Sequence, residues 1–321
     1  SIENNISVYT DRFYKEAGIS KQELLENTSV YYDKLKDQSP EYIKAIEGIA
    51  LSSNIPLLEI AMLNLRYELL YYALGKLYQE GVIDGCTSFA LLPGLVKKTH
   101  LVMGQNWDWI PEVECVLISN FDSDGLSRIS FTEAGIFAGK PGMNSQGIGL
   151  AVNGMYSSAD NWKRFEKPFH VRCFEVLRSS TIEQAMNVLT GTPRSCTANF
   201  IIGEHPDKIV NIELAPDTFL NFYPNQGLLT HANNFADPNN MDVSEPPNPR
   251  RHLSAFRHER MKFLLSTQKI LDMKMIQNTL KDHEHHPQSL CRHRDNDLPK
   301  SQQTITKTSM IMDLEDLNIW A

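Results

Sequence analysis

The spacing of apolar residues changes near residue 85. Before it, apolar side chains recur at the three- and four-residue intervals of amphipathic helices. Three helix starts are predicted: a capping box beginning at Ser20, an N-cap followed by proline at Ser39-Pro40, and a third start near Pro56. The third helix is expected to run toward Leu74, with Gly81 marking its end. Residues 1–80 are therefore predicted to be helical.

After Gly85 the pattern becomes that of short strands separated by Gly, Pro, Asn or Asp. Strands are predicted at 86–92, 100–105, 114–121, 128–132, 147–153, 197–202, 209–214, 218–222, 228–232, 304–314 and 318–320. Helices are predicted at 169–179, 182–189 and 254–280, and loops at the Pro-rich segment 237–250 and the His-rich segment 283–301. Because strands and helices are segregated, we expect an α+β fold with two antiparallel sheets and helices outside them.

Composition limits the possible partners. The chain has 321 residues, 41% of them hydrophobic, and 31 basic against 39 acidic residues, for a net charge of −8. No Lys/Arg-rich stripe stands out, so no nucleic-acid partner is expected. No apolar run reaches the roughly 18–20 residues of a membrane helix, and the polar start does not resemble a signal peptide. Five scattered cysteines do not form a disulfide framework, which favours a reducing, cytoplasmic compartment.

The pair Gly85-Cys86 is the strongest candidate for chemistry. Glycine permits the strained backbone angles that self-cleavage of a chain requires. A cut between the two residues would give Cys86 a free α-amine with a pKa of about 7.7–8.0. That amine could take the thiol proton directly or through one water, so the nucleophile would need no histidine. The alternative is that Cys86 is a small buried residue at the start of a strand.

Four further residues could support such a nucleophile. Asp108 lies among Trp107, Trp109 and Ile110, so its carboxylate is expected against apolar surface with a partner. Asn153 and Asn233 each end a predicted strand, where an amide can stabilise an oxyanion or simply form a turn. Arg292 could pair with Asp108 or hold a substrate carboxylate, although a surface arginine would look the same.

Two other arrangements are weaker. The residues His283, His285, His286, Cys291 and His293 could bind a metal, but they lack a recognisable zinc spacing, so no metal is expected. Cys86, His231 and Asn233 occur in the order of a papain-type triad, although the sequence around Cys86 does not match that family. A conventional cysteine peptidase with His231 as base is therefore kept as an alternative.

Several motifs in combination resemble the isopenicillin N acyltransferase family. They are Gly85-Cys86-Thr87, Gly104-Gln-Asn-Trp-Asp108, Thr132-Glu-Ala-Gly135, Gly139-Lys-Pro-Gly-Met-Asn144, His231-Ala-Asn233 and Ser289-Leu-Cys-Arg292. Upstream, Glu47-Gly-Ile-Ala50 and Asn64-Leu-Arg-Tyr-Glu-Leu69 are similar to the propeptide of that family. The resemblance covers most of the chain from about residue 40. The segments 238–249 and 283–301 depart from it.

The resemblance implies an N-terminal-nucleophile hydrolase with a four-layer αββα core. It implies self-cleavage between Gly85 and Cys86, leaving a helical propeptide, 1–85, as α subunit and a catalytic domain, 86–321, as β subunit. Cys86 would be both the cleavage residue and the acyl acceptor.

The same resemblance assigns roles to the supporting residues. Asp108 and Arg292 would support the nucleophile, and Asn233 would help to form the oxyanion hole. By a looser similarity to bile-salt hydrolases, Asn153 would lie in the same site.

Together these observations predict a self-processing amidase or acyltransferase that acts on a small N-acyl amide through an S-acyl-Cys86 intermediate. Hydrolysis is favoured over acyl transfer, because no sequence feature indicates a pocket that excludes water. No cofactor is expected, and the sequence does not indicate an oligomeric state. An uncleaved, non-catalytic scaffold on the same fold is the non-enzymatic alternative.

Overall fold

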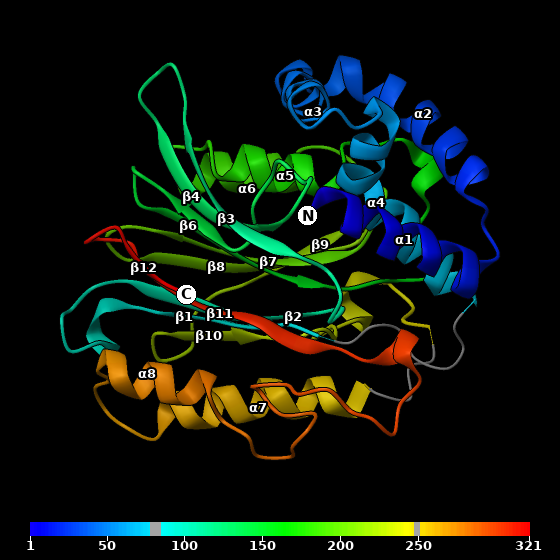
Figure 1. Ribbon diagram of the computed structural model, residues 1–321. Coiled ribbons are helices and arrows are strands. Elements are labelled where there is room, and N and C mark those ends of the chain that lie inside the picture. The colour runs from blue at the N-terminus through cyan, green and yellow to red at the C-terminus, as the bar shows by residue number, and fades with distance from the viewer. Residues whose placement is uncertain (78–84, 247–250) are drawn as a thin grey trace.

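The structure is a computed structural model that describes residues 1–77, 85–246 and 251–321. Its elements form four layers, helix–sheet–sheet–helix, with a group of N-terminal helices at one end of the sandwich (Figure 1). All strand pairs within the described residues are antiparallel. The architecture confirms the predicted α+β class and the αββα sandwich.

The two sheets are formed by strands that are distant in sequence. The five-stranded sheet has the order β10-β1-β2-β11-β12, with β1 at Thr87–Leu91, β2 at Val102–Trp109, β10 at Leu228–His231, β11 at Ile305–Asp313 and β12 at Asn318–Trp320. The seven-stranded sheet runs in sequence order, with β3 at Cys115–Phe121, β4 at Ser127–Glu133, β5 at Gly142–Asn144, β6 at Ile148–Gly154, β7 at Ala198–Glu204, β8 at Lys208–Leu214 and β9 at Phe219–Phe222.

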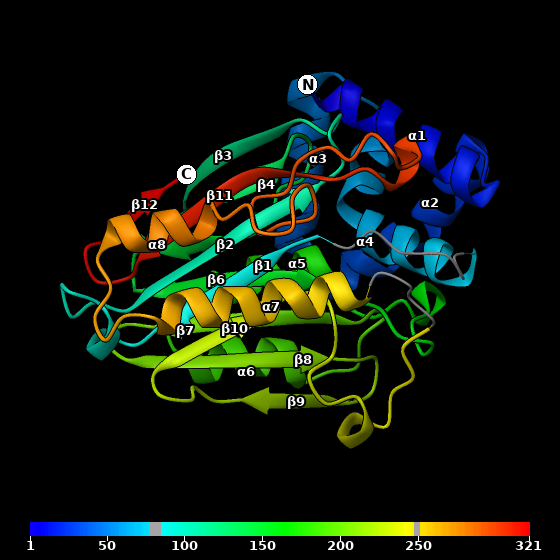
Figure 2. The same ribbon diagram turned by 90° about the horizontal axis from the view of Figure 1, so that it is seen from below.

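Helices cover the outer face of each sheet. The seven-stranded sheet is covered by α5 (Phe169–Val176) and α6 (Ile182–Thr190), and the five-stranded sheet by α7 (Arg251–Ser266) and α8 (Met273–Leu280) (Figure 1). Figure 2 shows α7 lying across the strands of the five-stranded sheet. The chain between α8 and β11, where the His-rich segment lies, is irregular apart from a single turn at Lys300–Gln302.

The N-terminal helices share a hydrophobic core with the sandwich. They are α1 (Ile2–Ala17), α2 (Lys21–Gln38), α3 (Pro40–Ser53) and α4 (Leu57–Leu77). The helix α4 packs against the other three and against α5, and its side chains from Ile60 to Leu70 are all buried. A helix that is buried on all sides has no solvent-facing polar side, and the polar side chains Asn64, Arg66 and Glu68 of α4 are themselves buried. One continuous core therefore joins α1–α4 to the sheets.

Most predicted elements are confirmed. Ser20 caps α2 by accepting a hydrogen bond from the Glu23 backbone N–H at 3.2 Å. Ser39 occupies the cap position of α3, but its side chain makes no capping hydrogen bond. The three-residue strand β5 was not predicted, because it is too short to show alternation. The helix predicted at 254–280 is two helices, separated at 267–272. Gly81 and residues 247–250 lie outside the described residues.

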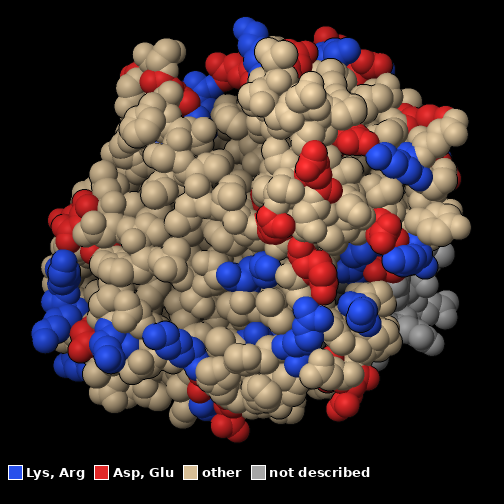
Figure 3. All heavy atoms as spheres, in the orientation of Figure 1, with Lys and Arg blue, Asp and Glu red and all other residues tan. Residues whose placement is uncertain are grey.

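The surface carries charges of both signs. On the face shown in Figure 3, acidic and basic side chains are interspersed over much of the molecule, with uncharged surface between them. Among the described helices, none has the length and apolar character needed to cross a lipid bilayer.

Candidate active site

The strands β1 and β2 bury polar side chains on the face that lies between the two sheets. Because side chains alternate along a strand, Ser88 and Gln105, which are cross-strand partners, both point toward β6. Ser88 donates a 2.6 Å hydrogen bond to Asn153 Oδ1, and Gln105 accepts one of 3.0 Å from the Val152 backbone N–H. Cys86 stands two residues before Ser88, so its side chain belongs to this inner face.

The opposite face of the same strands points toward α7 and the His-rich segment. Thr87 Oγ1 accepts a 3.2 Å hydrogen bond from Arg257 Nε of α7. Asn106 donates hydrogen bonds of 2.8 Å to the carbonyls of Leu280 and Leu290. Asp108 follows Asn106 by two residues and shares this outer face. The cysteine thiol and the aspartate carboxylate are therefore on different faces of the sheet, near the end of β1.

A small cavity lies where the two faces meet. Its volume is about 30 Å³, enough for one or two water molecules. Four of the residues that line it are sequence-predicted site or cleavage residues: Gly85, Cys86, Asp108 and Asn233. The structure thus brings together residues that are up to 148 positions apart in the chain.

Gly85 is tightly enclosed. A Cβ atom at this position would lie 2.8 Å from the Asp108 carbonyl oxygen, closer than real Cβ contacts come. The Gly85 backbone N–H donates to Asn233 Oδ1 at 3.2 Å. Any side chain at position 85 would push the backbone of that residue away from β2 and weaken its hydrogen bond to Asn233. Close backbone packing therefore gives a physical reason for glycine here.

Asn233 is held in one orientation by charged and neutral donors. Its Oδ1 accepts from Gly85 N–H and, at 2.9 Å, from Arg257 Nη2, and its Nδ2 donates to the Gly154 carbonyl at 2.9 Å. Two donors on one atom identify that atom as the amide oxygen. An amide nitrogen carries two hydrogens, so the second N–H of Asn233 can donate to another acceptor in the cavity.

Asp108 is completely buried and is positioned by β11. Thr306, its cross-strand partner, donates to Asp108 Oδ1 at 2.6 Å. Thr306 Oγ1 also accepts a 2.7 Å hydrogen bond from the Arg292 backbone N–H. The Arg292 guanidinium Nε lies 3.8 Å from Asp108 Oδ2. Asp108 and Arg292 are therefore neighbours, as predicted, and Thr306 links them.

Asn153 lies on β6 of the seven-stranded sheet, opposite β1. Its Oδ1 accepts hydrogen bonds from Ser88 and, at 3.2 Å, from Asn199 Nδ2. Its Nδ2 is buried and makes no hydrogen bond with the described residues. Val152 and Gly154 on either side of it contribute to the cavity lining. Asn153 is thus adjacent to the site through Ser88, and its role there stays a prediction.

The environment of Cys86 keeps its thiol protonated in the continuous chain. Burial, and then the negative charge of Asp108, raise the pKa of the Cys86 thiol to about 12. The Sγ atom lies 3.9 Å from the Asp108 carbonyl oxygen, which is an acceptor and not a base. At pH 7 only about one thiol in 100,000 with this pKa is ionised. Within the described residues the hydrogen-bond acceptor of this thiol is that carbonyl oxygen, so a base has to come from elsewhere.

A buried charge cluster forms another wall of the cavity. Arg66 of α4 lies 4.9 Å from the ring centroids of both Tyr9 and Trp109, and its Nε donates to Glu133 Oε2 at 2.9 Å. Tyr9 also donates to Glu133, and Lys140 Nζ lies 3.5 Å from Glu133 Oε1. The positive charges of Arg66 and Lys140 lower the pKa of Glu133 despite its burial.

Lys140 also contacts a buried histidine. His170 Nδ1 lies 2.9 Å from the Asn64 carbonyl, so it donates there and leaves Nε2 as an acceptor. Lys140 Nζ donates to this Nε2 at 2.9 Å. Burial and the charge of Lys140 hold the pKa of His170 well below its usual value, so the imidazole is neutral. The cluster of Arg66, Glu133, Lys140 and His170, here called the charge cluster, joins α4 and α5 to β4.

Sequence reasoning missed Arg257 and Thr306. Each is an ordinary polar residue within a helix or strand, and only the fold places it beside Asn233 or Asp108. Glu133 and Lys140 could have been found, because both stand in the motifs Thr132-Glu-Ala-Gly135 and Gly139-Lys-Pro-Gly-Met-Asn144, which had been noted only for their resemblance.

Two antiparallel sheets between outer helices, with a cysteine directly before the first strand, have the fold of N-terminal-nucleophile hydrolases. The chain belongs to the acyl-coenzyme A:6-aminopenicillanic acid acyl-transferase family, whose sequence profile matches residues 96–321. It is thereby an enzyme of the acyltransferase and amide hydrolase class.

Individual relatives agree with this assignment. The acyl-coenzyme A:6-aminopenicillanic-acid-acyltransferase 40 kDa form of Emericella nidulans is 27% identical over 267 residues, which cover 80% of this chain and 69% of that protein. Among solved structures, the N-acylethanolamine-hydrolyzing acid amidase ortholog of Caenorhabditis elegans has a TM-score of 0.52 at 15% identity, covering 73% of this chain and 99% of that one. A single-residue variant of conjugated bile acid hydrolase from Clostridium perfringens has a TM-score of 0.50 at 18% identity, covering 72% of this chain and 87% of that one. At these identities the two structures support the fold alone.

Proposed function

We propose that this protein is a self-processing cysteine amidohydrolase or acyltransferase that cleaves its own chain between Gly85 and Cys86. The observation that carries the proposal is the position of Asn233, whose oxygen accepts from the Gly85 N–H and whose amide group lines the cavity of Cys86. An amide side chain that binds the residue before the nucleophile can orient both the chain to be cut and, later, a substrate carbonyl.

Cleavage would begin at the Gly85 carbonyl carbon. Cys86 Sγ adds to that carbon, the peptide C–N bond breaks, and the Cys86 nitrogen leaves as an amine with the thiol proton, so that Gly85 is held as a thioester. Water then hydrolyses the thioester, which restores the thiol and leaves a carboxylate on Gly85. The second N–H of Asn233 would stabilise the oxyanion in each addition.

The proposed cut also explains how a thiol with a raised pKa becomes useful. Cleavage converts the Cys86 backbone N–H into an α-amine with a pKa of about 7.7–8.0, which can accept the thiol proton directly or through water. A substrate amide carbonyl is then attacked by the thiolate, the amine product leaves with the proton from the α-amine, and water or a second amine takes the acyl group from sulfur. Hydrolysis stays the favoured outcome.

The substrate class is a small N-acyl amide. The Emericella nidulans relative is named for transfer of an acyl group to an amine, and hydrolysis or formation of an N-acyl amide uses the same S-acyl intermediate. Trp107, Trp109, Tyr67 and Phe169 give the cavity aromatic walls, which favour an apolar or aromatic acyl group.

The four N-terminal helices would remain bound after cleavage as the α subunit, residues 1–85. Arg66 and Tyr9 of these helices bind Glu133 of β4, and Tyr67 Oη donates to the Thr197 carbonyl at 2.7 Å. These buried contacts and the shared core do not depend on the peptide bond at Gly85, so the proposed domain 86–321 keeps its partner.

The alternative with His231 as catalytic base is less favoured. Both ring nitrogens of His231 are engaged, Nε2 with Glu213 Oε1 at 2.7 Å and Nδ1 with the Ala232 carbonyl at 2.7 Å. Replacing His231 with alanine distinguishes the two mechanisms. Full loss of amidase activity with intact processing would support the histidine mechanism and contradict an α-amine base.

Intact mass is the direct test of the proposal. Wild-type protein is expected to convert to fragments of 85 and 236 residues, and Cys86→Ala is expected to remain one chain of 321 residues without amidase activity. Cys115→Ala is the matched control, because Cys115 also begins a strand but lies outside the cavity. Wild-type protein that stays whole on long incubation, and is not labelled by a thiol-reactive amide probe, would contradict the proposal.

A further inference from the structure

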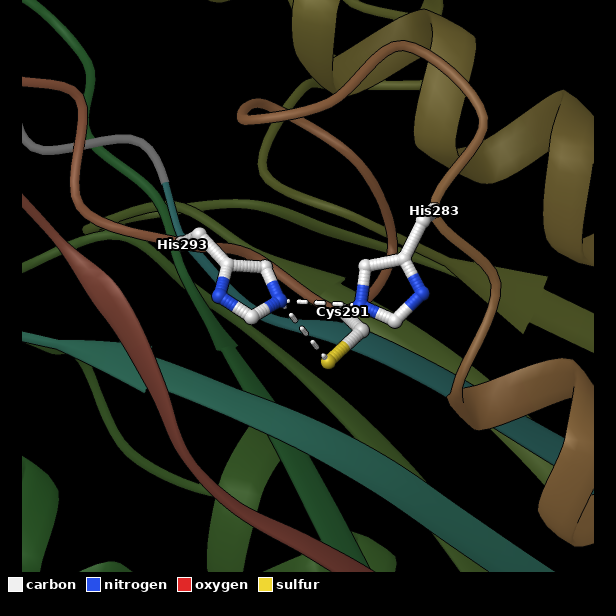
Figure 4. A group of neighbouring side chains, drawn as sticks. All are labelled: His283, Cys291 and His293. Carbon is white, nitrogen blue, oxygen red and sulfur yellow. Dashed lines mark hydrogen bonds between the residues drawn. The ribbon is translucent and has the colours of Figure 1, made fainter.

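Three side chains of the His-rich segment converge on one point at the surface. Figure 4 shows the imidazoles of His283 and His293 facing each other, with the Cys291 thiol beside them. The two Nε2 atoms are 2.8 Å apart, and Cys291 Sγ is 3.9 Å from His293 Nε2. One potential ligand atom from each residue lies within 4.8 Å of the other two. His286 is a neighbour of this group, with its ring centroid 5.1 Å from that of His293, but it is not one of the three residues whose ligand atoms lie within 4.8 Å of one another.

These distances approach those of a tetrahedral metal site. With bonds of about 2.0 Å to nitrogen and about 2.3 Å to sulfur, the ligand atoms around zinc are separated by about 3.3 Å for two nitrogens and about 3.6 Å for nitrogen and sulfur. The observed separations of 2.8 and 3.9 Å differ from these by a few tenths of an ångström. The third pair, His283 and Cys291, lies within 4.8 Å, so side-chain rotations would have to bring the three atoms around one ion.

The backbone that carries these ligands is anchored on several sides. Asp282, next to His283, forms a two-point ion pair with Arg260 of α7 at 3.0 and 2.7 Å. The Asp282 carbonyl accepts from the Cys291 backbone N–H at 3.0 Å, and the neighbouring Leu290 is fully buried. His293 N–H donates to the Pro287 carbonyl at 3.0 Å. The ligands are therefore brought together by folding, and a metal would not need to order the chain first.

We propose that His283, Cys291 and His293 form a binding site for a zinc-class divalent transition metal ion, with the fourth position taken by water or by His286 after rotation of its side chain. Two imidazoles and a thiolate are ligands that such ions prefer over Mg²⁺ or Ca²⁺. Binding would remove the thiol proton from Cys291 and the proton shared by the two histidine Nε2 atoms. No recognisable zinc spacing marks these residues in the sequence, because the fold supplies the proximity.

The site flanks a residue of the candidate active site. Arg292 lies between the ligands Cys291 and His293, and its backbone N–H and carbonyl both bond to Thr306, which donates to Asp108. A metal bound on both sides of Arg292 would fix the segment that carries it. The site is nevertheless separate from Cys86, and its existence does not depend on the proposed self-cleavage.

Cobalt and zinc titrations test the site. With Co²⁺, the full-length protein is expected to bind one equivalent and to develop a sulfur-to-cobalt charge-transfer band, and Zn²⁺ is expected to displace it. The titration is repeated in Cys86→Ala, which removes the other thiol in this region. The band must persist there. Loss of the band in Cys86→Ala would place the metal in the cavity and overturn the proposal.

Ligand variants provide the second comparison. Cys291→Ser is expected to abolish the charge-transfer band, and His293→Ala and His283→Ala to weaken binding by at least about 10-fold. His285→Ala is the matched control, because His285 lies in the same segment but packs on Phe256, with ring centroids 5.0 Å apart. It should bind like wild type. Equal affinity in all variants, or no binding by the wild-type protein at micromolar metal, would refute the site.

Discussion

Two buried acidic groups on opposite sides of the Cys86 cavity have pKa values that are shifted in opposite directions. On one side, Glu133 of the charge cluster contacts Arg66 and Lys140 and accepts a hydrogen bond from Tyr9, and its pKa is lowered despite complete burial. On the other side, Cys86 is buried near the negative charge of Asp108, and the pKa of its thiol is raised to about 12. On the first side, positive and negative side chains already contact one another in the continuous chain. On the second side, the described residues give the Cys86 thiol a carbonyl oxygen as its hydrogen-bond acceptor and not a base.

We therefore expect the charge cluster to contribute mainly to stability and the surroundings of Cys86 mainly to the proposed reaction. The charge cluster joins the N-terminal helices to β4, and its opposite charges already contact one another in the continuous chain. The Cys86 side is arranged by neutral hydrogen bonds around Asn233 and by Arg257, and in the proposed mechanism its base is the α-amine that cleavage would create. Variants of the two sides should therefore affect different measurements.

The largest effect on stability is expected from Glu133→Gln. Removing this carboxylate takes away the buried negative charge that Arg66 and Lys140 both contact, which should cost about 3–5 kcal/mol. Urea unfolding in the single-chain Cys86→Ala background measures it. Asp217→Asn is the control, since Asp217 pairs with Arg164 at the surface and should cost about 1 kcal/mol or less. Similar losses in the two variants would remove the distinction between the charge cluster and an ordinary ion pair.

On the Cys86 side, Asn233→Ala should slow the proposed self-cleavage by about 10²–10³-fold. It removes an oxyanion donor and the acceptor of the Gly85 N–H, whereas most of the core contacts remain. The rate at which the two fragments appear, followed by intact mass, gives the value. Asn234→Ala, which loses the hydrogen bond from Ser254 and the 3.2 Å bond to the Phe235 carbonyl but no contact with Gly85, should change the rate by less than about 10-fold. A wild-type rate in Asn233→Ala would exclude the oxyanion role.

A pH dependence of stability distinguishes two buried glutamates. Glu68 accepts a 2.6 Å hydrogen bond from the Phe169 N–H, but burial dominates and raises its pKa from 4.5 to about 7. The folded protein therefore binds more protons than the unfolded chain between these values, and Glu68 destabilises the fold increasingly as pH rises from 4.5 to about 7. The full cost above that range is about 3 kcal/mol.

We therefore compare the free energy of unfolding of Glu68→Gln with that of its parent, by urea unfolding at pH 5 and at pH 8. The difference between the two proteins should shift in favour of the variant at pH 8. Glu133 has the opposite sign. Its lowered pKa gives stability that is present above pH 4.5 and is lost as pH falls through its folded-state pKa. Parallel pH profiles for the two glutamine variants would contradict the difference in environment.

The smallest effect is expected from Arg257→Lys, at about 10-fold on the proposed cleavage rate. Lysine cannot reproduce the two contacts that Arg257 makes with Thr87 and Asn233. If Arg257 acts by positioning Asn233, adding Arg257→Lys to Asn233→Ala should produce little further loss. Arg251→Lys, at an exposed position of the same helix, is the control. Fully additive losses would show that Arg257 acts independently of Asn233.

Local patterns predicted most elements of the fold. The capping sequence at Ser20, the proline after Ser39 and the alternation of short strands after Gly85 each depend on a few neighbouring residues, so they can be recognised without the tertiary structure. The strand β5 could not be recognised, because its three residues, Gly142–Asn144, are a strand only through pairing with β4 and β6. The break at 267–272 was missed because the apolar spacing continues on both sides of it.

The candidate site was predictable in its residues but not in its geometry. Gly85, Cys86, Asp108 and Asn233 were all identified, and they line one cavity. That the thiol and the Asp108 carboxylate lie on opposite faces of the sheet, linked around the end of β1, depends on the register between β1 and β2. The residues that complete the arrangement, Arg257 and Thr306, carry no local signal of their role.

The sequence by itself indicated the candidate nucleophile Cys86, the α+β class and the set of motifs that mark the family, because each depends on residue type and near-neighbour spacing. Only the tertiary structure decided which polar groups share a buried environment, since hydrogen bonds between residues more than one hundred positions apart arise from the packing of whole sheets. The same reason explains His283, Cys291 and His293. Their spacing in the sequence predicted no metal site, and the folded segment brings their ligand atoms within 4.8 Å of one another.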